Sequence, residues 1–496
     1  MTTPARHMPR VPQYYADAVS RRLCASTHLD PDFARQVRKE FTGDRIDALG
    51  LPLGVNLVAL VRHAEVAVRR ERARDHLFAL LFALLVVTGA GAVLSFLGGA
   101  ASWATSLIAA VVLLWGLAWV LRYRALGEAW NAAYTVHWGA EGPEALAPAV
   151  DPEAETGLSG LRRANVVVYD AEVGHDDPFV GHGKRVRKTV WQPIDVGSPA
   201  QAPNGGTQTI TPFDEAELHT FVAREMKHLS GLKGLRSHNR LYVAGTHAPL
   251  LGGDLVPDPE RPPLTRVPSA LVRSALIHPG AGMRTYLSLE RVGEGGRIVV
   301  VMHLRARLHA AQLSWEVTVH LIPPLGPRFD AVDHVPHPGW RRVRRMVHML
   351  RTQQEWRLRG APGRCLARAR QRAVRARRLE RERRDITRNR LQHDYGARDT
   401  LRSRWADQER MGHNELQDAQ DILNRLQQGV LLATKRFLTA HHIDTSSFDS
   451  ASKVINNQTY NFTGDINQGV FGAQGTIQNQ YGPQPQQGSP APQPGA

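Results

Sequence analysis

Residues 77–121 decide the fold, and they read LFALLFALLVVTGAGAVLSFLGGAASWATSLIAAVVLLWGLAWVL. The stretch holds 45 consecutive residues without Asp, Glu, Lys, Arg or His. One helical crossing of a bilayer needs about 20 apolar residues, so the stretch is long enough for two. The small residues 98–102 offer a break between the crossings. The sequence therefore predicts a transmembrane hairpin over residues 76–122, with spans at 77–97 and 103–121.

A buried helical hairpin of a soluble protein is the alternative. Such helices normally keep one polar stripe, and this stretch has none. Trp103, Trp119 and Tyr123 also lie where aromatic belts form at membrane surfaces. No ionisable residue lies at membrane depth, although pumps and ion-coupled transporters usually need one. We therefore expect the hairpin to be an anchor and not a conduit.

Basic residues flank both ends of the hairpin, and its turn has none. Arginines close to the ends of a span resist translocation and remain in the cytoplasm. The pattern predicts a multi-pass protein of the cell inner (plasma) membrane with both termini in the cytoplasm. Its first partner is then the lipid bilayer. The residues predicted to contact the membrane surface are Arg69, Arg70, Arg72, Arg74, Arg122 and Arg124.

The positive charge of the chain is concentrated in one stretch. The formal net charge is +16, and residues 341–412 supply nearly all of it with 23 Arg against 8 Asp plus Glu. The only two cysteines, Cys24 and Cys365, exclude a disulfide framework. Residues 1–15 lack the apolar core of a signal peptide, so we expect the hairpin itself to direct insertion.

At 496 residues the chain should form about three units. Residues 1–75 are interpreted as a helical cytoplasmic lead-in. Within them, Asp30 and Pro31 are typical of an N-cap and the first position of a helix, which we expect to run to Phe41. A second helix is expected from about residue 54 to residue 75, where it meets the first span.

Residues 157–340 change from helical to alternating periodicity. Apolar side chains take every second position in two stretches, 298–305 and 314–321, which is typical of β-strands. The predicted fold class is an α+β membrane protein whose cytoplasmic domain, residues 157–340, has a mostly antiparallel sheet. Further strands are expected at residues 165–170, 188–196, 240–246 and 284–292, and a helix with an acidic first turn at residues 214–229.

Residues 341–440 are interpreted as an Arg-rich helical or coiled-coil arm. Its basic half has three readings: a solvated face, contact with anionic lipid headgroups worth about 1 kcal/mol per arginine near the surface, or nucleic-acid binding, against which the scarcity of aromatic residues argues. The later half has a coiled-coil pattern that either packing on the sheet domain or self-association explains. The residues of this seam are Leu416, Ala419, Leu423, Leu426, Val430, Ala433 and Phe437.

One short motif partly matches a phosphate-binding loop. Residues 181–184 read GHGK, and glycines let backbone N–H groups approach a phosphate. A P-loop, however, needs four residues between its glycines and a Ser or Thr after its lysine, where Arg185 stands. We therefore interpret residues 181–184 as a charged surface turn.

The sequence predicts no catalytic, cofactor-binding or metal-ligating residue, and no cofactor. The densest group of metal-ligand types is His175, Asp176, Asp177 and His182, on a loop that does not promise a fixed geometry. An enzyme or ligand sensor in the domain of residues 157–340 stays open as an alternative. The lack of a catalytic motif argues against an enzyme.

Residues 445–496 have a tail composition of Asn, Gln, Gly, Ser and Pro, and residues 482–496 are expected to be disordered. Within the tail, residues 456–480 read NNQTYNFTGDINQGVFGAQGTIQNQ and repeat with an offset of eleven. A β-arch that stacks on copies of itself would place glycines at its bends and Ile and Phe inside. The residues predicted to carry this self-assembly are Phe462, Gly464, Ile466, Asn467, Gly475, Ile477 and Gln478.

Residues 456–480 resemble the short amyloid-type signalling motifs at the ends of bacterial immune-type proteins. The remainder of the chain resembles uncharacterised actinobacterial membrane proteins, which implies no activity. In the signalling families such tails template one another, so that a sensor recruits an effector. The resemblance implies a homotypic or tail-bearing protein partner and a homo-oligomer. The leading hypothesis is a membrane-anchored, cytoplasm-facing adaptor or effector that assembles through its C-terminal tail.

Overall fold

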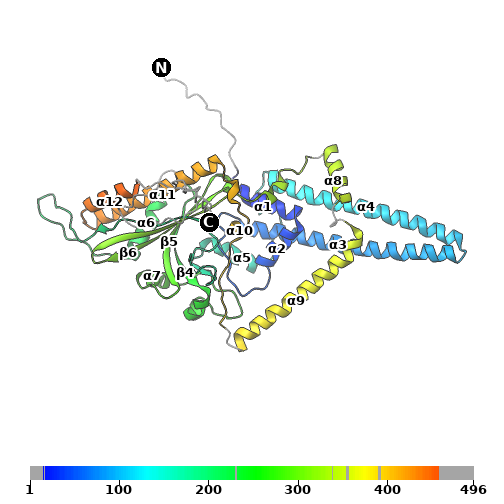
Figure 1. Cartoon of the computed structure of the whole chain (residues 1–496), viewed down its shortest axis with the longest axis horizontal. Coiled ribbons are helices and arrows are strands. Elements are labelled where there is room, and N and C mark those ends of the chain that lie inside the picture. Colours follow the sequence, from blue (N-terminus) through cyan, green and yellow to red (C-terminus); the bar gives the residue numbers. More distant parts are fainter. Residues whose placement is uncertain are drawn as a thin grey trace, which may run out of the picture.

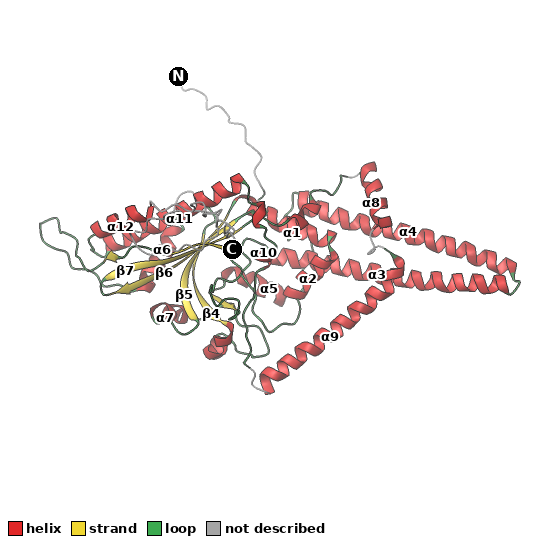
Figure 2. Ribbon diagram, in the orientation of Figure 1, coloured by secondary structure: helices red, strands yellow, loops and turns green. Residues whose placement is uncertain are grey.

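Figures 1 and 2 show an α/β body that holds the whole sheet and two long helices that project from it. The long helices are α3 (Leu57–Leu97) and α4 (Ala101–Trp138), and each is long and apolar enough to cross a membrane. The structure, a computed structural model, describes residue 15 and residues 17–228, 232–337, 339–352, 357–388 and 392–456.

The hairpin turns where the sequence predicts a break. The helix α3 ends at Leu97, and Gly99 then takes a φ of +77°, which favours glycine because it has no Cβ. In the most apolar 18-residue stretch of each helix, only 17% of α3 and 11% of α4 is buried against the rest of the protein. Both helices also continue into the body, since α4 extends beyond the predicted span end at residue 121 to Trp138.

The lead-in forms two helices, α1 (Ala18–Leu29) and α2 (Pro31–Phe41), which pack on the body-side halves of α3 and α4. The side chain of Asp30 accepts a hydrogen bond from the backbone N of Phe33 at 3.0 Å, so the predicted N-cap is confirmed. The core between these helices contains Leu23, Phe33, Leu60, Ala133 and Phe329.

The sheet is mixed and has the strand order β1-β4-β5-β6-β7-β2, with β3 also on β7. The pair β1–β4 is parallel, and the other pairs among the described residues are antiparallel. Most of the expected strands are therefore present with shifted ends. The strands are β1 (Val166–Tyr169), β2 (Lys184–Val190), β3 (Ile194–Asp195), β4 (Arg236–Ala244), β5 (Met283–Val292), β6 (Val299–His309) and β7 (Gln312–Ile322).

Helices cover one apolar face of the sheet. They are α6 (Glu215–Met226), α11 (His413–Ala440) and α12 (Ser446–Asn456). Asp214 caps α6, since its side chain accepts a hydrogen bond from the backbone N of Glu217 at 2.7 Å. The predicted coiled-coil seam of α11 is buried from Ala419 to Phe437 in this core, so the described residues support packing on the sheet and not a coiled coil. The region interpreted as the tail, residues 445–496, begins with a helix, because α12 occupies Ser446–Asn456.

The Arg-rich stretch does not form one arm with α11. It contains α8 (Trp340–Thr352), which crosses α4, and α9 (Ala361–Arg388), which runs obliquely from α3 to the lower side of the body (Figure 1). The remaining elements are the helices α5 (Pro152–Gly160), α7 (Ser269–Ile277) and α10 (Leu401–Arg404), and the short 3-10 helices η1 (Leu161–Arg163), η2 (Gly245–Asp254), η3 (Glu294–Gly296), η4 (Pro327–Val332), η6 (Leu358–Gly360) and η7 (Gln408–Arg410).

Candidate functional site at the hairpin base

Four other helices pack against α3 or α4 where these two leave the body, and we call this region the hairpin base. It comprises residues 67–76 of α3 and 122–130 of α4, with the ends of α1 and α2, the helix α8 and the start of α9 packed on them. Met346 and Leu350 of α8 share a core cluster with Phe78, Leu126 and Trp130. The base therefore joins segments from both halves of the chain.

The four predicted membrane-surface arginines of α3 lie in this base but differ in environment. Arg69 is largely exposed and pairs with Glu65 at 2.9 Å. Arg70 is partly buried, and its Nε lies 3.9 Å from Glu128 Oε2. Arg72 is half-buried, whereas Arg74 is buried and its Nε donates to Asp75 Oδ1 at 3.0 Å. Arg74 is thus committed to an internal ion pair.

The two predicted arginines of α4 divide in the same way. Arg124 is exposed. Arg122 is half-buried, donates to the backbone oxygen of Leu350 and places its guanidinium 5.1 Å from the centre of the Trp119 ring. Arg122 therefore holds α8 against α4, a role that the sequence does not reveal.

Asp75 attaches α9 to α3. Its side chain is fully buried and accepts from Arg74 Nε at 3.0 Å, from Arg364 Nε at 3.1 Å and from Arg368. A carboxylate at the last turn before an uncharged span would be costly without cationic partners. Three arginines supply them, and two come from α9.

The helix α8 has two distinct faces. Its buried face carries Met346, Leu350 and Arg342, whose Nη2 donates to Asn131 Oδ1 at 2.7 Å and to the Gly127 oxygen at 3.2 Å. A Cβ added at Gly127 would lie 3.4 Å from Met346 Cε, which is an ordinary van der Waals contact, so Met346 packs directly beside this position of α4. The exposed face carries Trp340, Arg341, Arg344, Arg345, His348 and Arg351, and Arg345 also borders the adjacent cavity.

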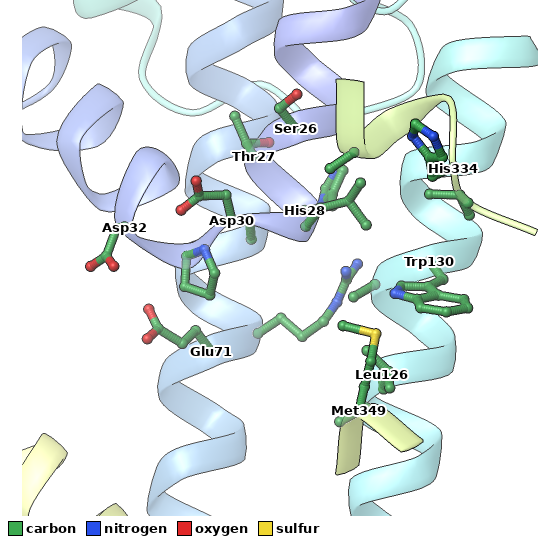
Figure 3. A pocket seen from close by; sticks show the side chains of 18 of the residues that line it. Ser26, Thr27, His28, Asp30, Asp32, Glu71, Leu126, Trp130, His334 and Met349 are labelled. Carbon is green, nitrogen blue, oxygen red and sulfur yellow. The ribbon is translucent and has the colours of Figure 1, made fainter. Parts of the chain in front are cut away.

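The base contains an open cavity of about 560 Å³, shown in Figure 3. Glu71 of α3 lies on one side, and Leu126 and Trp130 of α4 lie on the other. The end of α1 closes one end with His28, and Met349 of α8 lies at the opposite end. One wall is therefore polar and the facing wall apolar, and this cavity is the candidate site.

The carboxylates that line this cavity already have cationic partners. Asp30 pairs with Arg328 at 2.5 Å. Asp32 and Glu71 both pair with Arg35, which lies outside the cavity lining. The polar wall therefore presents neutralised pairs, and an additional cation would find little uncompensated negative charge there.

Two arginines of the lining have weaker partners. Arg70 has its nearest ion-pair contact with Glu128 at 3.9 Å, and burial lowers the pKa of Arg70 while Glu128 raises it only in part. Arg345 Nη1 donates to the backbone oxygen of His334 at 2.9 Å, and among the described residues no carboxylate pairs with it. The lining therefore has positive charge available for an anion.

A pair of buried histidines supports the cavity from behind. His63 Nε2 lies 2.7 Å from the Pro143 oxygen, and His63 Nδ1 lies 3.0 Å from His28 Nε2. Because a carbonyl oxygen only accepts, we assign the proton of His63 to Nε2, so that His28 donates to His63. Burial lowers the pKa of both imidazoles, which keeps them neutral.

A second polar group lies inside the body, on the sheet face opposite α6 and α11. His303 Nδ1 lies 3.0 Å from Ser288 Oγ, and His320 Nε2 lies 2.9 Å from Asp177 Oδ2. The ring of Phe179 stacks on His303 with centroids 3.7 Å apart, and His182 packs edge-on against His303 at 4.9 Å. Burial holds the pKa of His182 at about 4 and the pKa of His303 well below 6.5.

The nearby ion pair of Arg240 and Glu290 is also buried. Burial opposes ionisation of Glu290, but the Arg240 guanidinium outweighs it and holds the pKa of this carboxyl below its ordinary value. Arg240 Nε also donates to the Ala164 oxygen at 3.1 Å. This pair ties β4 to β5 and carries a structural role.

The four residues of the densest group of metal-ligand types, His175, Asp176, Asp177 and His182, have different environments in the structure. His175 is exposed beside Asp176, Asp177 binds His320, and His182 is buried, so residues 181–184 are not simply a surface turn. Within the described ranges, no three His, Cys, Asp or Glu side chains are grouped to hold a metal ion.

The predicted self-assembly residues of the tail lie outside the described residues. They are Phe462, Gly464, Ile466, Asn467, Gly475, Ile477 and Gln478.

Sequence reasoning missed the cavity, because its walls come from five segments far apart in the chain. One local signal was present at Asp75, a carboxylate two residues before the stretch 77–121 that has no ionisable side chain. Such a residue needs a cationic partner, and α9 supplies two.

Comparison with known proteins gives one match. The family model described as "AbeC-like domain" matches residues 190–478, which is more than half of the chain. The match begins at the last residue of β2 and includes the strands β3 to β7 and the helices α8, α9, α11 and α12, but neither β1 nor the hairpin. No curated protein and no solved structure matches the chain. The family description names no activity.

Proposed function

The chain belongs to the AbeC-like domain family, and we propose that it is a membrane-anchored, cytoplasm-facing adaptor or effector that assembles through its C-terminal tail. The main support for the anchor is the hairpin, whose apolar side chains are largely exposed. Phe96, Leu97 and Trp103 are 72%, 76% and 71% exposed. A contiguous apolar surface of this kind marks an interaction site, and a bilayer is the partner that fits two spans.

The proposed orientation places the body and both termini at the cytoplasmic side of the inner membrane. Arg69, Arg70 and Arg124 lie at the body end of the spans, and the turn at residues 98–102 carries no charge. The positive flank of a short hairpin normally stays in the cytoplasm. The hairpin base then lies at the inner surface of the membrane.

The proposed assembly rests on the composition of residues 456–480. This segment follows α12, which is packed on α11 and β3 through Phe448, Ala451 and Ile455. The tail therefore leaves from the body and not from the hairpin. A homotypic or tail-bearing protein partner, and a homo-oligomer, follow from the proposal.

Deleting residues 457–496 tests this function and leaves every described helix intact. We expect the full-length protein to remain in the membrane pellet after alkaline extraction and to form large assemblies in mild detergent. The truncated protein should remain in the pellet but run as a smaller species in gel filtration. Equal sizes would refute assembly through the tail, and release by alkali would refute the anchor.

A second candidate function is contact with anionic lipid through α8. The exposed face of this helix combines Trp340, which is 78% exposed, with four arginines. Basic residues with an interfacial tryptophan are typical of helices at a membrane surface. By contrast, α9 is fixed at Asp75 and at the body, where Thr387 Oγ1 donates to Glu260 at 2.7 Å, so it is better described as a strut.

A further inference from the structure

We propose that the cavity at the hairpin base binds the headgroup of an anionic phospholipid, with the phosphate between Arg70 and Arg345. This inference rests on the proposed insertion of the hairpin, because the bilayer supplies the ligand. It goes beyond the proposed function by assigning a defined site for one lipid molecule.

The position of the cavity suits a lipid. Its lining includes Arg74 of α3 and Ala125 of α4, and each lies within four residues of the uncharged stretch 77–121. It extends from there into the body as far as Ala67. A headgroup at the inner surface of the membrane therefore reaches the cavity without leaving the bilayer.

The charges of the lining favour an anion. The carboxylates of Asp30, Asp32 and Glu71 are held by Arg328 and Arg35. Arg70 is partly buried with a distant carboxylate, and Arg345 has a backbone oxygen as its partner. A phosphate accepts charge-assisted hydrogen bonds from guanidinium groups in a bidentate geometry, so it would stabilise both side chains.

The rest of the lining fits the other parts of a phospholipid. Leu126, Trp130 and Met349 form an apolar wall that can contact the glycerol and the first methylenes of the chains. Ser26 and Thr27 line the α1 end, and their hydroxyls donate to the oxygens of Arg22 and Cys24, which leaves oxygen lone pairs free to accept from a polar headgroup. The volume of about 560 Å³ is in the ordinary range of ligand pockets.

The two arginines could also bind inorganic phosphate, but the apolar wall of the cavity favours a lipid. Native mass spectrometry of the full-length protein in mild detergent separates the two sources. The probes are phosphatidylglycerol, phosphatidylcholine with the same chains, and inorganic phosphate. We expect one retained phosphatidylglycerol per chain, weaker retention of phosphatidylcholine, and no displacement by inorganic phosphate at millimolar concentration.

The double variant R70Q/R345Q removes both proposed phosphate ligands. Its matched control, R261Q/R307Q, removes the same charge from two exposed arginines of the body, which lie outside both the cavity lining and the predicted membrane contacts. We expect R70Q/R345Q to weaken phosphatidylglycerol binding by about tenfold or more, and the control to change it less than about twofold. A third variant, A67F, fills the cavity without changing charge and should also prevent retention.

Equal losses in R70Q/R345Q and R261Q/R307Q would overturn the inference, because diffuse attraction would then explain the binding. Equal retention of the two lipids, or displacement by inorganic phosphate, would also overturn it. Alkaline extraction of the same variants reports the anchor separately. A protein that stays in the membrane but shows no selective lipid contradicts the site alone, whereas extraction by alkali contradicts the proposed anchor.

Discussion

Burial decides what the histidines of this chain do. The sequence has 22 of them, and the loop containing His175 and His182 invites a metal hypothesis. The fold leaves His175 at the surface and buries His182 against His303 and His320. No local pattern separates these two residues of the loop. The partners of His182 come from β6 and β7, far along the chain, so the sequence could not predict the difference.

The buried histidines make the stability of the fold depend on pH. An imidazole in the unfolded chain has a pKa of about 6.5, whereas burial holds the pKa of His182 and that of His219 at about 4 in the folded chain. The unfolded state therefore binds more protons between these values, and stability falls as the pH falls through that window. At pH 5 each such group costs about 2 kcal/mol relative to pH 7.5.

Thermal unfolding of the detergent-solubilised protein at pH 7.5 and pH 5 measures this dependence. H182Q should reduce the drop in Tm between the two pH values, because one buried group that titrates is gone. The matched control is H175Q, which replaces an exposed histidine of the same loop and should keep the full drop. Identical pH profiles for H182Q and the wild type would contradict the prediction.

At the scale of elements, local chemistry predicted where several helices start and turn. Asp30 caps α2 as expected, because an N-cap needs only its own next residues. The helix α6 also begins near the predicted start at residue 214, with Asp214 as its N-cap. The end of α3 at Leu97 follows from the glycines that come next. The strand pattern also identified β6 and β7. Buried and half-buried side chains alternate over the first part of β7, whereas β6 is buried on both faces from Val299 to Ala306.

The partner of an amphipathic helix could not be predicted in this way. The seam of α11 shows that one face is buried, and the fold uses that face on the sheet beside α6. The Arg-rich stretch was expected to be one arm with α11, but α8 packs on α4 and α9 joins α3 to the body. Periodicity identifies the buried face of a helix, whereas tertiary contacts choose what covers it.

The attachment of α9 depends on Asp75. D75N keeps the shape of the side chain but removes the charge that holds Arg74, Arg364 and Arg368. Breaking a buried ion pair costs about 3–5 kcal/mol, so we expect the start of α9 to detach more often from α3. Cys365 reports this opening, because its Sγ lies 3.8 Å from His76 Nδ1 of α3.

The rate of maleimide labelling at Cys365 in mild detergent measures the detachment. We expect D75N to increase it by at least about tenfold, since the open population rises about tenfold for each 1.4 kcal/mol by which opening becomes easier. Cys24 is buried and should stay unlabelled. E380Q is the control, since it removes an exposed carboxylate of the same helix. An unchanged rate in D75N would show that Asp75 does not hold α9.

At the scale of the whole molecule, the hairpin base joins segments that precede and follow the sheet in the chain. The helices α1 and α2 come before the hairpin, and α8 and α9 come after the sheet, yet all four pack on α3 or α4. Arg22 of α1 reaches Asp330 and Asp333 at 2.9 Å and 2.7 Å. Several contacts therefore link the base to the body.

The proposed orientation makes a prediction for the two native cysteines and for the turn of the hairpin. Burial raises the pKa of Cys24, which should make it unreactive on either side of a membrane. Cys365, at the start of α9, is half-exposed and lies at the hairpin base, so the orientation places it in the cytoplasm. Ser102, in the turn, is exposed at the opposite end of the hairpin.

In spheroplasts, a membrane-impermeant maleimide should label S102C and leave Cys365 unlabelled, and lysis should then expose Cys365. The expected result follows from the arginines at the base, since moving them across the bilayer with the body would oppose the positive-inside preference. The variant C365S supplies the background for the lysed sample. Labelling of Cys365 in intact spheroplasts would contradict the orientation, and the lipid site would then belong to the outer surface of the membrane.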